Sequence, residues 1–454
     1  MEKEKYNEND SNPESQIGTE IFEGSVDRTE DVGTKFPPET AAPVEGPTTL
    51  DVPDGGLTAW LQVLGAFVIM LSTWGLINSF GVFQTYYETA PLAPSSSSSD
   101  ISWIGSLQGA LLNVGGLVSG PLFDAGYFRA LTISGSLLLL LGLFMTSLCR
   151  AYWQVLLAQG VAVGIGCGLL FLPSAAILSQ YFARRRALAL GLQSAGSPVG
   201  GIVFSILFGR LQPRIGFGWA TRVMAFILLG LLVVPLAFMR PRVAPPRHKR
   251  AFFDRDAVRD VPFLSFAASA LSAFMGMYVP FFYLQLFALR RGIASTDLAA
   301  YLVTLLNAGS VFGRILPNFA ADYLGSMNML AAMTLGASVL AFGWLGANDL
   351  GGTITFALLF GFFNGGVTSL PPSAIVSLTP DLGRLGTRMG MLFAFIGMAV
   401  LVGTPIAGAI LKDVNDDGAW KGLIGYCAAT LFVGGLGFVG TQMLHLRRER
   451  NTKG

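Results

Sequence analysis

Twelve long apolar segments constrain the fold of this 454-residue chain more than any other feature of its sequence. A transmembrane helix needs about 20 consecutive apolar residues to cross the hydrocarbon core of a bilayer. Because lipid offers the backbone no hydrogen-bond partners, only helices and closed barrels span it. The sequence therefore predicts an all-α polytopic membrane protein, with transmembrane helices near 59–84, 101–122, 129–149, 153–178, 187–209, 219–239, 262–288, 298–321, 327–347, 353–377, 389–411 and 422–445.

Charged residues are scarce and unevenly distributed. They make up 13% of the chain, where a soluble domain has about 25%. Residues 1–54 nevertheless hold 14 of the 28 acidic residues and only 4 of the 30 basic ones. Residues 1–53 are rich in Glu, Pro, Thr and Ser and cannot bury a core, so they are predicted to form a disordered acidic tail. The tail lacks an apolar region after a basic start, so we expect no cleavable signal peptide.

A polar, basic segment at 241–261 divides the twelve apolar segments into two groups of six. We expect a six-helix bundle at 54–240, a linker at 241–261, a second bundle at 262–446 and a tail at 447–454. Basic residues are enriched in the linker and in the loops on its side of the membrane, which predicts that both termini are cytoplasmic. We expect a multi-pass protein of the plasma membrane, with a vacuolar or other organelle membrane as the alternative.

The two groups of segments resemble each other at one fixed offset. Pro173-Ser174-Ala175 recurs 199 residues later as Pro372-Ser373-Ala374, and Asp124 recurs 198 residues later as Asp322. A repeat in the same membrane order indicates a parallel duplication.

Arg314 is the only charged residue between Leu298 and Ala321, in the middle of the eighth apolar segment. A charge deep in a bilayer costs about 2.5–3.5 kcal/mol on insertion scales, so such a residue usually faces a cavity or a partner. If the chain carries an anion, Arg314 is the first candidate for binding it. The alternative is a structural role, against helix-end carbonyls or a loop carboxylate.

Clusters typical of catalysis or metal binding are not visible in the sequence. The three cysteines lack metal-ligand spacing, both histidines lie in basic flanking segments, and the acidic residues after the tail fall in loops or at helix ends. An enzyme is therefore disfavoured, and we expect no cofactor and no metal. A nucleic-acid partner is not expected either. A proton relay of mid-membrane carboxylates or histidines is also not visible.

Two motifs point to a known family. The first, entering helix 1, is Asp54-Gly55-Gly56-Leu57-Thr58-Ala59-Trp60, which resembles the D-G-G-x-x-W signature of the monocarboxylate porters, a family of the major facilitator superfamily, with one more residue before the tryptophan. The second, entering helix 5, reads YFARRRALALGLQSAG at 181–196 and resembles that family's second signature. Its matching or neighbouring residues are Tyr181, Phe182, Arg184, Arg185, Arg186, Gly191 and Gly196. The acidic N-terminal tail is similar to that of the fungal branch.

The resemblance implies a major facilitator fold with a central cavity in which the helix 8 arginine meets an anionic substrate. It places Asn78 and Asn307 near that cavity, and Asn113, Tyr278 and Phe281 are further candidates for its lining. It also implies an inner-gate role for the Arg184–Arg186 trio with Asp124 and Asp322, although the trio suits an anchor to anionic lipid equally well. The chain has Asn78 where better-known relatives have a lysine and Ser310 where they have a carboxylate, so proton-coupled transport of lactate type is not expected.

We therefore expect a carrier that moves a small organic anion or acidic metabolite through the lipid bilayer, acting as a monomer. Export of a secondary metabolite is favoured slightly over import of a monocarboxylate or a vitamin such as riboflavin. A membrane nutrient sensor without transport is the alternative of another class. The substrate itself is not predicted by the sequence.

Overall fold

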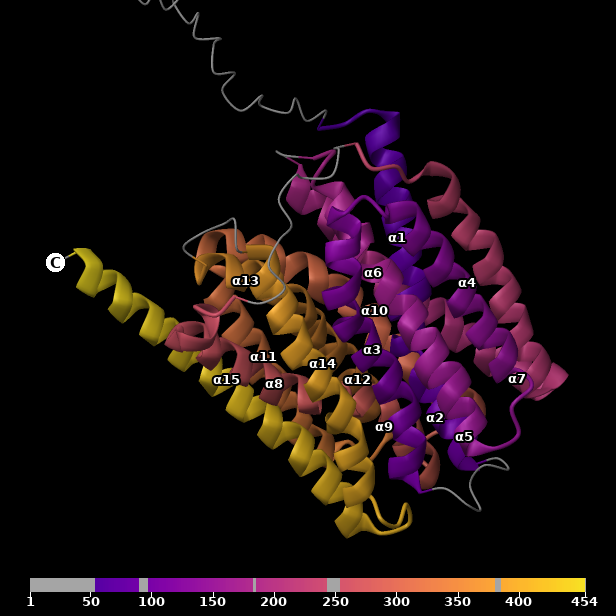
Figure 1. Ribbon diagram of the computed structural model, residues 1–454. Coiled ribbons are helices and arrows are strands. Elements are labelled where there is room, and N and C mark those ends of the chain that lie inside the picture. Colours follow the sequence, from indigo (N-terminus) through magenta and orange to yellow (C-terminus); the bar gives the residue numbers. More distant parts are fainter. Residues whose placement is uncertain (1–53, 90–96, 183–184, 243–253, 380–384, 454) are drawn as a thin grey trace, which may run out of the picture. The chain divides into compact units, whose positions relative to one another are not determined.

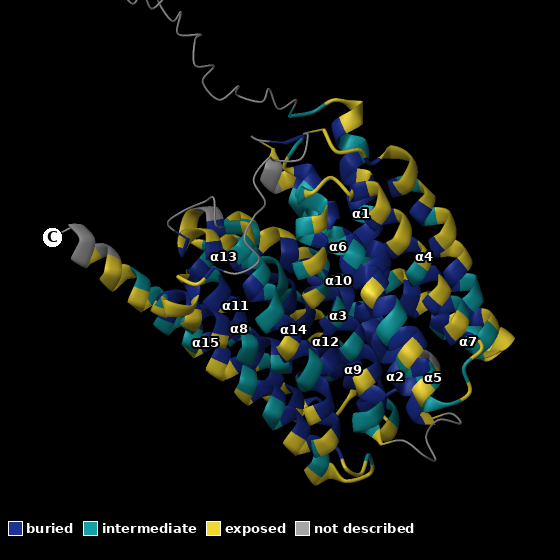
Figure 2. Cartoon of the chain, viewed as in Figure 1, coloured by how far each residue is buried: buried dark blue, intermediate teal, exposed yellow. Residues whose placement is uncertain are grey.

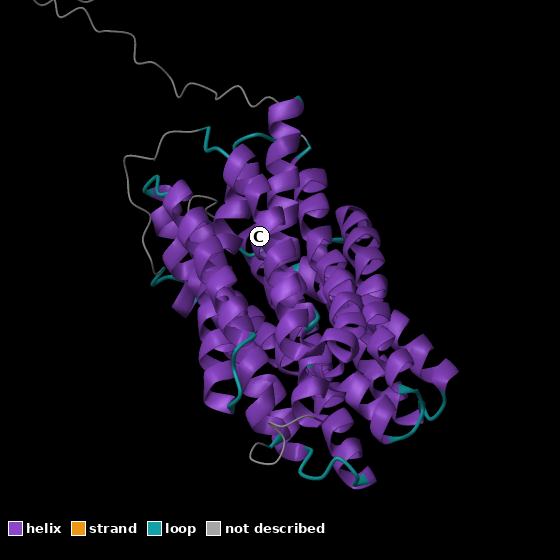
Figure 3. Cartoon of the chain, turned by 90° about the vertical axis from the view of Figure 1, so that its right-hand side faces the viewer, coloured by secondary structure: helices purple, strands orange, loops and turns teal. Residues whose placement is uncertain are grey.

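The computed structural model describes residues 54–89, 97–182, 185–242, 254–379 and 385–453. Helices and short loops make up these residues, with no strand among them (Figure 3). The predicted acidic tail, residues 1–53, lies outside the described ranges.

The helices fall into a group before the linker and a group after it (Figure 1). The first group consists of α1 (Leu57–Asn78), α2 (Phe80–Thr89), α3 (Ser98–Asp124), α4 (Phe128–Thr146), α5 (Tyr152–Val155), the π-helix η2 (Leu156–Val163), α6 (Gly164–Leu178) and α7 (Arg186–Phe238). After the short helix η3 (Ala257–Arg259), the second group consists of α8 (Val261–Met277), α9 (Val279–Arg290), α10 (Thr296–Leu324), α11 (Ser326–Gly343), η4 (Trp344–Gly346), α12 (Leu350–Ser369), α13 (Pro371–Ser377), α14 (Leu385–Ile410) and α15 (Asp417–Lys453).

Eleven stretches of the described helices are long and apolar enough to cross a membrane, and one of them contains two predicted spans. That stretch, Leu188–Phe238, has 51 residues and would extend about 75 Å as a straight helix, more than twice the hydrocarbon core of about 30 Å. The chain turns at Gly216 (φ 77°, ψ 164°), a conformation that glycine adopts without a steric penalty. A turn at this single glycine therefore takes the place of the loop that the sequence predicts at 210–218. With this turn, the described helices account for the twelve predicted crossings.

The helix boundaries follow the repeat in the sequence. Helices α3, α4 and α5 begin 198 residues before α10, α11 and α12, respectively. The first crossing of each group is also broken at an equivalent place, because α1 gives way to α2 at Ser79 and α8 gives way to α9 at Tyr278, 199 residues later. Both breaks lie next to candidate site residues.

The loops between successive crossings fall on two sides of the helices. We call the side that carries the linker the linker side, and the opposite side, which includes Gly216 and the start of α3, the far side. The first described part of the linker is fastened to helices of the first group. The Gln62 side-chain oxygen accepts from the Arg240 N–H (2.9 Å), and the Tyr181 hydroxyl donates to the Arg240 carbonyl (2.7 Å). Gln180 accepts from the Arg242 N–H (2.8 Å).

Many large apolar side chains of the helices are exposed and many uncharged polar side chains are buried, which differs from the pattern of a soluble protein; Figure 2 shows which parts of the helices are exposed. Helix α10 shows the pattern clearly. Phe312 and Phe319 are more than 60% exposed, whereas Asn307 and Ser310 are at most 1% exposed. Because exposed apolar side chains are favourable in lipid, this arrangement presents the apolar face to the bilayer and turns the polar face towards the other helices.

Close helix packing in the first group depends on small residues. Helices α1 and α7 meet where a Cβ atom on Gly75 would lie 2.7 Å from the Cα atom of Gly200. Pairs of this kind let two membrane helices approach at backbone distance. They also bring Asn78 of α1, which follows Gly75, and Ser197 of α7, which precedes Gly200, close to α10.

Candidate substrate site

Arg314 is buried within its span. It follows the first residue of α10 by 18 positions and precedes the last by 10, which places it about 27 Å from the far-side end and about 15 Å from the linker-side end. The residue is 7% exposed. The described chain therefore holds a guanidinium deep among the helices.

Polar residues from three helices meet at Arg314. Ser197 of α7 accepts a long hydrogen bond from Arg314 Nη2 (3.5 Å) and a second from Asn78 Nδ2 of α1 (3.0 Å). Asn307, two turns before Arg314 on α10, donates to the backbone carbonyl of Asn78 (3.4 Å). This network joins helices of the first group to α10 of the second, so it lies at the interface between the two groups.

The charge of Arg314 is not compensated by a carboxylate among the described residues. Its Nε atom is buried without a hydrogen-bond partner, as are the Ser310 hydroxyl and the Asn307 side-chain oxygen. The hydroxyl of Ser197 is the one side-chain acceptor that the described residues supply to it. A buried charge is normally paired, so Arg314 is a candidate for binding an anion.

Aromatic rings surround the same network. The Tyr278 phenol interacts electrostatically with Arg314, and its ring lies nearly parallel to that of Trp74 (14° between planes, 6.4 Å between centroids). Phe281 contacts the other side of Tyr278 edge-on, at 6.1 Å. The structure therefore brings Asn78, Asn307, Tyr278 and Phe281 into one neighbourhood with Arg314.

Asn113 has a different setting. Its amide donates to the carbonyl of Gly109 in its own helix, α3 (2.8 Å), and its side-chain oxygen has no partner. The residue packs against Gly397 of α14. Within the described residues, no hydrogen bond connects Asn113 to Arg314.

The two sequence motifs meet on the linker side. The backbone N–H of Asp54 donates to the Tyr181 carbonyl (3.1 Å), and the Asp54 carboxylate accepts from the Arg185 N–H (3.3 Å). The rings of Trp60 and Phe182 are in edge contact at 5.2 Å. Gly56 has φ 85° at the start of α1, which explains the glycine at this position. The contacts between the two motifs thus hold the start of α1 beside the start of α7.

The remaining motif residues are less informative. Gly196 packs against the backbone of Phe67, whereas no atom lies within 4 Å of the position where a Cβ would stand on Gly191. Gly55 is equally open. Asp124 is the last residue of α3. Arg184 and the side chains of Arg186 and Asp322 lie outside the described residues, so the inner-gate role of these residues stays a prediction.

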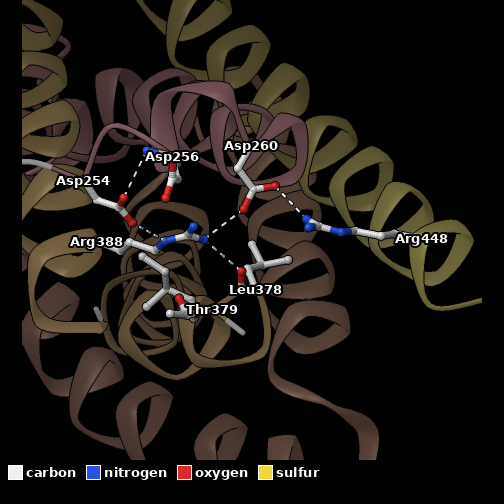
Figure 4. Close-up of polar contacts among 8 residues, drawn as sticks. Asp254, Asp256, Asp260, Leu378, Thr379, Arg388 and Arg448 are labelled. Atoms are coloured by element: carbon white, nitrogen blue, oxygen red, sulfur yellow. Dashed lines mark hydrogen bonds and ion pairs between the residues drawn. The ribbon is translucent and has the colours of Figure 1, made fainter. Parts of the chain in front are cut away.

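A second buried arginine has the opposite environment (Figure 4). Arg388 of α14 is 6% exposed. Its Nε atom pairs with Asp254 (3.1 Å) and its Nη1 atom with Asp260 (2.9 Å), and Asp260 also pairs with Arg448 of α15 (2.9 Å). Asp260, Arg388 and Arg448 line an open pocket of about 420 Å³ on the linker side. The cluster fastens the end of the linker to the second group of helices.

Contacts between the two groups are concentrated from the level of Arg314 towards the far side. The Ser99 hydroxyl donates to the Pro405 carbonyl (2.9 Å), Ser106 hydrogen-bonds with Thr404, and the Tyr283 hydroxyl donates to the Ser98 carbonyl (3.4 Å). The carbonyl of Phe281 lies against Gly81, where a Cβ would be 2.1 Å away. The described structure is therefore closed on its far side.

Sequence reasoning missed three residues of the interior. Ser197 carries no signal of its own, because a serine in a glycine-rich helix is common, yet it bridges Asn78 and Arg314. Trp74 precedes Asn78 by one helical turn, so that spacing was the available signal. Glu88, expected at a helix end, is only 9% exposed and accepts a hydrogen bond from Gln84 in α2.

The family is decided by comparison with known proteins. The sequence profile of the Major Facilitator Superfamily matches residues 57–379. The chain belongs to the major facilitator superfamily. It is thus a multi-pass membrane transporter and not an enzyme, as the sequence predicts; the finer assignment to the monocarboxylate porters is not part of this match.

Three similar proteins come from fungi. The chain is 46% identical over 382 residues to the MFS-type transporter dbaD of Emericella nidulans, covering 84% of this chain and 85% of the relative. It is 36% identical over 408 residues to the aspyridones efflux protein apdF of the same organism (90% and 82%), and 38% identical over 408 residues to the fujikurins efflux protein of Gibberella fujikuroi (89% and 86%).

Solved structures of other superfamily members share the fold. The peptide transporter POT in complex with alafosfalin superimposes with a TM-score of 0.67 at 15% identity, covering 87% of this chain and 97% of that one. The nucleoside transporter NupG gives a TM-score of 0.66 at 12% identity (84% and 99%). At such identities the likeness concerns the fold alone.

Proposed function

We propose that this transporter exports a small organic anion, an acidic secondary metabolite, and that Arg314 binds its anionic group. The observation that carries the proposal is the uncompensated guanidinium of Arg314 at the interface of the two helix groups. A neutral substrate would leave that charge unpaired throughout the cycle, whereas a carboxylate or enolate would pair with it through charge-assisted hydrogen bonds.

The direction of transport rests on two supports. Two relatives are named for the efflux of aspyridones and fujikurins. In addition, the described structure is closed on its far side. With the linker and both termini in the cytoplasm, as the distribution of basic residues predicts, a protein closed on its far side can take up its substrate from inside the cell once the linker side opens. We place the protein in the plasma membrane, acting as a monomer.

Alternating access follows from the interface. The contacts between Ser99 and Pro405 and between Tyr283 and Ser98 join the two groups at the far side, so opening that side requires these contacts to break. Arg314 lies between them and the linker side. Rocking of the two groups about this level would expose the site first to one side and then to the other.

Membership of the monocarboxylate porters, in their fungal branch, is part of the same proposal. Its support is the contact between the two motifs, in which Asp54 binds both Tyr181 and Arg185. The proposal excludes the proton coupling of the better-known relatives, because Asn78 and Ser310 offer an amide and a hydroxyl where those relatives have ionisable groups.

The test is a metabolite profile of cells and medium with and without the gene. We expect deletion to retain one or more anionic metabolites inside the cells, and reintroduction of the wild-type gene to restore them to the medium. An Arg314→Gln variant at equal membrane abundance should fail to restore them, and Arg314→Lys should restore them partly, since lysine keeps the charge and loses the planar fork.

Two results would overturn the proposal. Restoration by Arg314→Gln would remove the arginine from the site. If the anionic metabolites accumulated in the medium rather than in the cells after deletion, the protein would be an importer, the alternative that the sequence leaves open.

A further inference from the structure

Two aromatic rings face each other across the interface beside Arg314. Trp74 belongs to α1, and Tyr278 stands at the break between α8 and α9. Their planes differ by 14° and their centroids are 6.4 Å apart. Aromatic contacts at edge-to-face angles are common throughout this protein, but a near-parallel pair contributed by both helix groups at the level of the site is a different geometry.

This pair continues a row of rings that leads from the linker side. Phe171 of α6 touches Trp74 (5.7 Å) and also touches Phe393 of α14, across the interface (5.9 Å). Phe171 and Phe393 are partly buried, whereas Trp74 and Tyr278 are 8% and 2% exposed. The row therefore runs inward, from partly accessible rings to the buried pair.

The Trp74–Tyr278 pair is connected to the polar network around Arg314. Trp74 and Asn78 are four residues apart on α1 and share one face of that helix. Asn78 reaches Ser197, and Ser197 reaches Arg314. Tyr278, which comes from the other helix group than Trp74, lies within electrostatic range of Arg314. A ligand whose anionic group sits on the arginine thus has a ring from each helix group beside it.

Separation of the two groups on the linker side must part these rings, because each belongs to a different group. A planar, conjugated ligand restores contact on both faces, and stacked aromatic pairs gain stability beyond the area that they bury. A saturated ring of the same size is puckered and has no π-face, so it restores the burial without the stacking.

We propose that the carried anion contains a planar aromatic or conjugated ring, which is held between Trp74 and Tyr278 while its anionic group binds Arg314. The inference rests on the proposed function, because it names the substrate class of the same site. On this inference, Trp74 and Tyr278 select planar over saturated acids, and Arg314 selects anions over neutral molecules.

The test uses two acids with equal carbon number and equal charge, cinnamate and 3-cyclohexylpropanoate, and the purified full-length protein in vesicles or detergent. The quantity measured is the ratio of their dissociation constants. We expect the wild-type protein to bind cinnamate about 5- to 100-fold more tightly, which corresponds to stacking on one or two faces. Equal affinities, or no binding of either acid, would refute the inference.

Variants locate the selectivity. Trp74→Leu and Tyr278→Leu should reduce the ratio towards one, and Trp74→Phe and Tyr278→Phe should retain most of it, which also guards against a fold defect in the leucine variants. The matched control is Phe80→Leu. Phe80 is a buried ring that contacts Phe282 across the interface (4.8 Å), but it lies further towards the far side, so its loss should leave the ratio unchanged.

The same measurement separates this inference from the proposed function. Arg314→Gln should weaken the binding of both acids to a similar extent and leave their ratio intact. If Arg314→Gln changes neither affinity, the proposed function fails. If it weakens both while the leucine variants of Trp74 and Tyr278 keep the wild-type ratio, anion binding stands and the planar ring is refuted.

Discussion

Arg314 and Arg388 are equally buried, at 7% and 6% exposure, but we predict that their replacement by methionine has opposite effects on stability. In Arg314→Met, the variant no longer buries an uncompensated charge, which relieves about 2.5–3.5 kcal/mol. It loses one long hydrogen bond to Ser197 (3.5 Å), worth about 1 kcal/mol. The substrate-free protein should therefore be stabilised by about 2 kcal/mol.

Arg388→Met is the matched control. Asp254 and Asp260 flank Arg388 at 3.1 and 2.9 Å, and their side chains are only 7% and 8% exposed. Removing one partner of a buried ion pair costs about 3–5 kcal/mol, because both carboxylates stay buried with one positive charge fewer beside them. Methionine keeps an unbranched apolar side chain at both positions, so the two variants differ chiefly in the charge environment that they disturb.

Thermal unfolding of the purified proteins in one detergent measures the sign directly. We expect the midpoint to rise for Arg314→Met and to fall for Arg388→Met. Arg314→Met should also bind the substrate anion about 10- to 150-fold more weakly, because it loses one charge-assisted hydrogen bond or more. A fall in the midpoint of Arg314→Met would show that the charge is compensated in the resting protein, and the reasoning from an unpaired guanidinium would be refuted.

Three further perturbations probe the surroundings of the site. Gly201→Ala places a Cβ atom 2.2 Å from the Asn307 side-chain oxygen, so we expect Asn307 to be displaced and transport to fall at least tenfold. The control, Gly191→Ala, adds its Cβ in open space and should leave transport unchanged. Equal transport by both variants would contradict this. Ser197→Ala removes the hydroxyl that bridges α1 and α10, and the loss of about 1 kcal/mol should raise the KM for the substrate about three- to tenfold. A change in kcat with an unchanged KM would contradict this prediction. Tyr283→Phe deletes the far-side hydrogen bond to the Ser98 carbonyl (3.4 Å). A cysteine placed in the far-side half of the interface should then react faster with a membrane-impermeant thiol reagent. An unchanged reaction rate would show that this contact does not hold the far side closed.

Features that depend on long runs of residues were predictable from the sequence. The number of crossings follows from apolar length, since each helix must cover the same thickness of hydrocarbon. The isolated position of Arg314 was equally visible, because a single charge stands out against an apolar run. The single-residue turn at Gly216 was not, because nothing local distinguishes this glycine from the other 55 in the chain.

The partners of a buried group depend on helix rotation, which the sequence does not display. Ser197 reaches Arg314 from a helix 117 residues away, and only the packing of α7 against α1 and α10 sets that contact. Asn113 illustrates the reverse, since its polarity suggested the site but its helix directs its amide to Gly109. Arg388 lies just before the helix that the sequence predicts at 389–411, and two carboxylates at the end of the linker pair with it in a buried position.

The linker is fastened at both of its ends, to α1 and the loop before α7 through Arg240 and Arg242 and to α14 through Asp254 and Asp260. Twelve peptide bonds separate Arg242 from Asp254, a length of chain that reaches at most about 40 Å. Each set of contacts joins one end of the linker to one helix group, so the linker is a covalent tether between the two groups. A tether contributes mainly by keeping the effective concentration of one body near the other high. Alignment of the two bodies then depends on the interface alone, and two polypeptides divided between residues 243 and 253 should still assemble into a working carrier when they are made together.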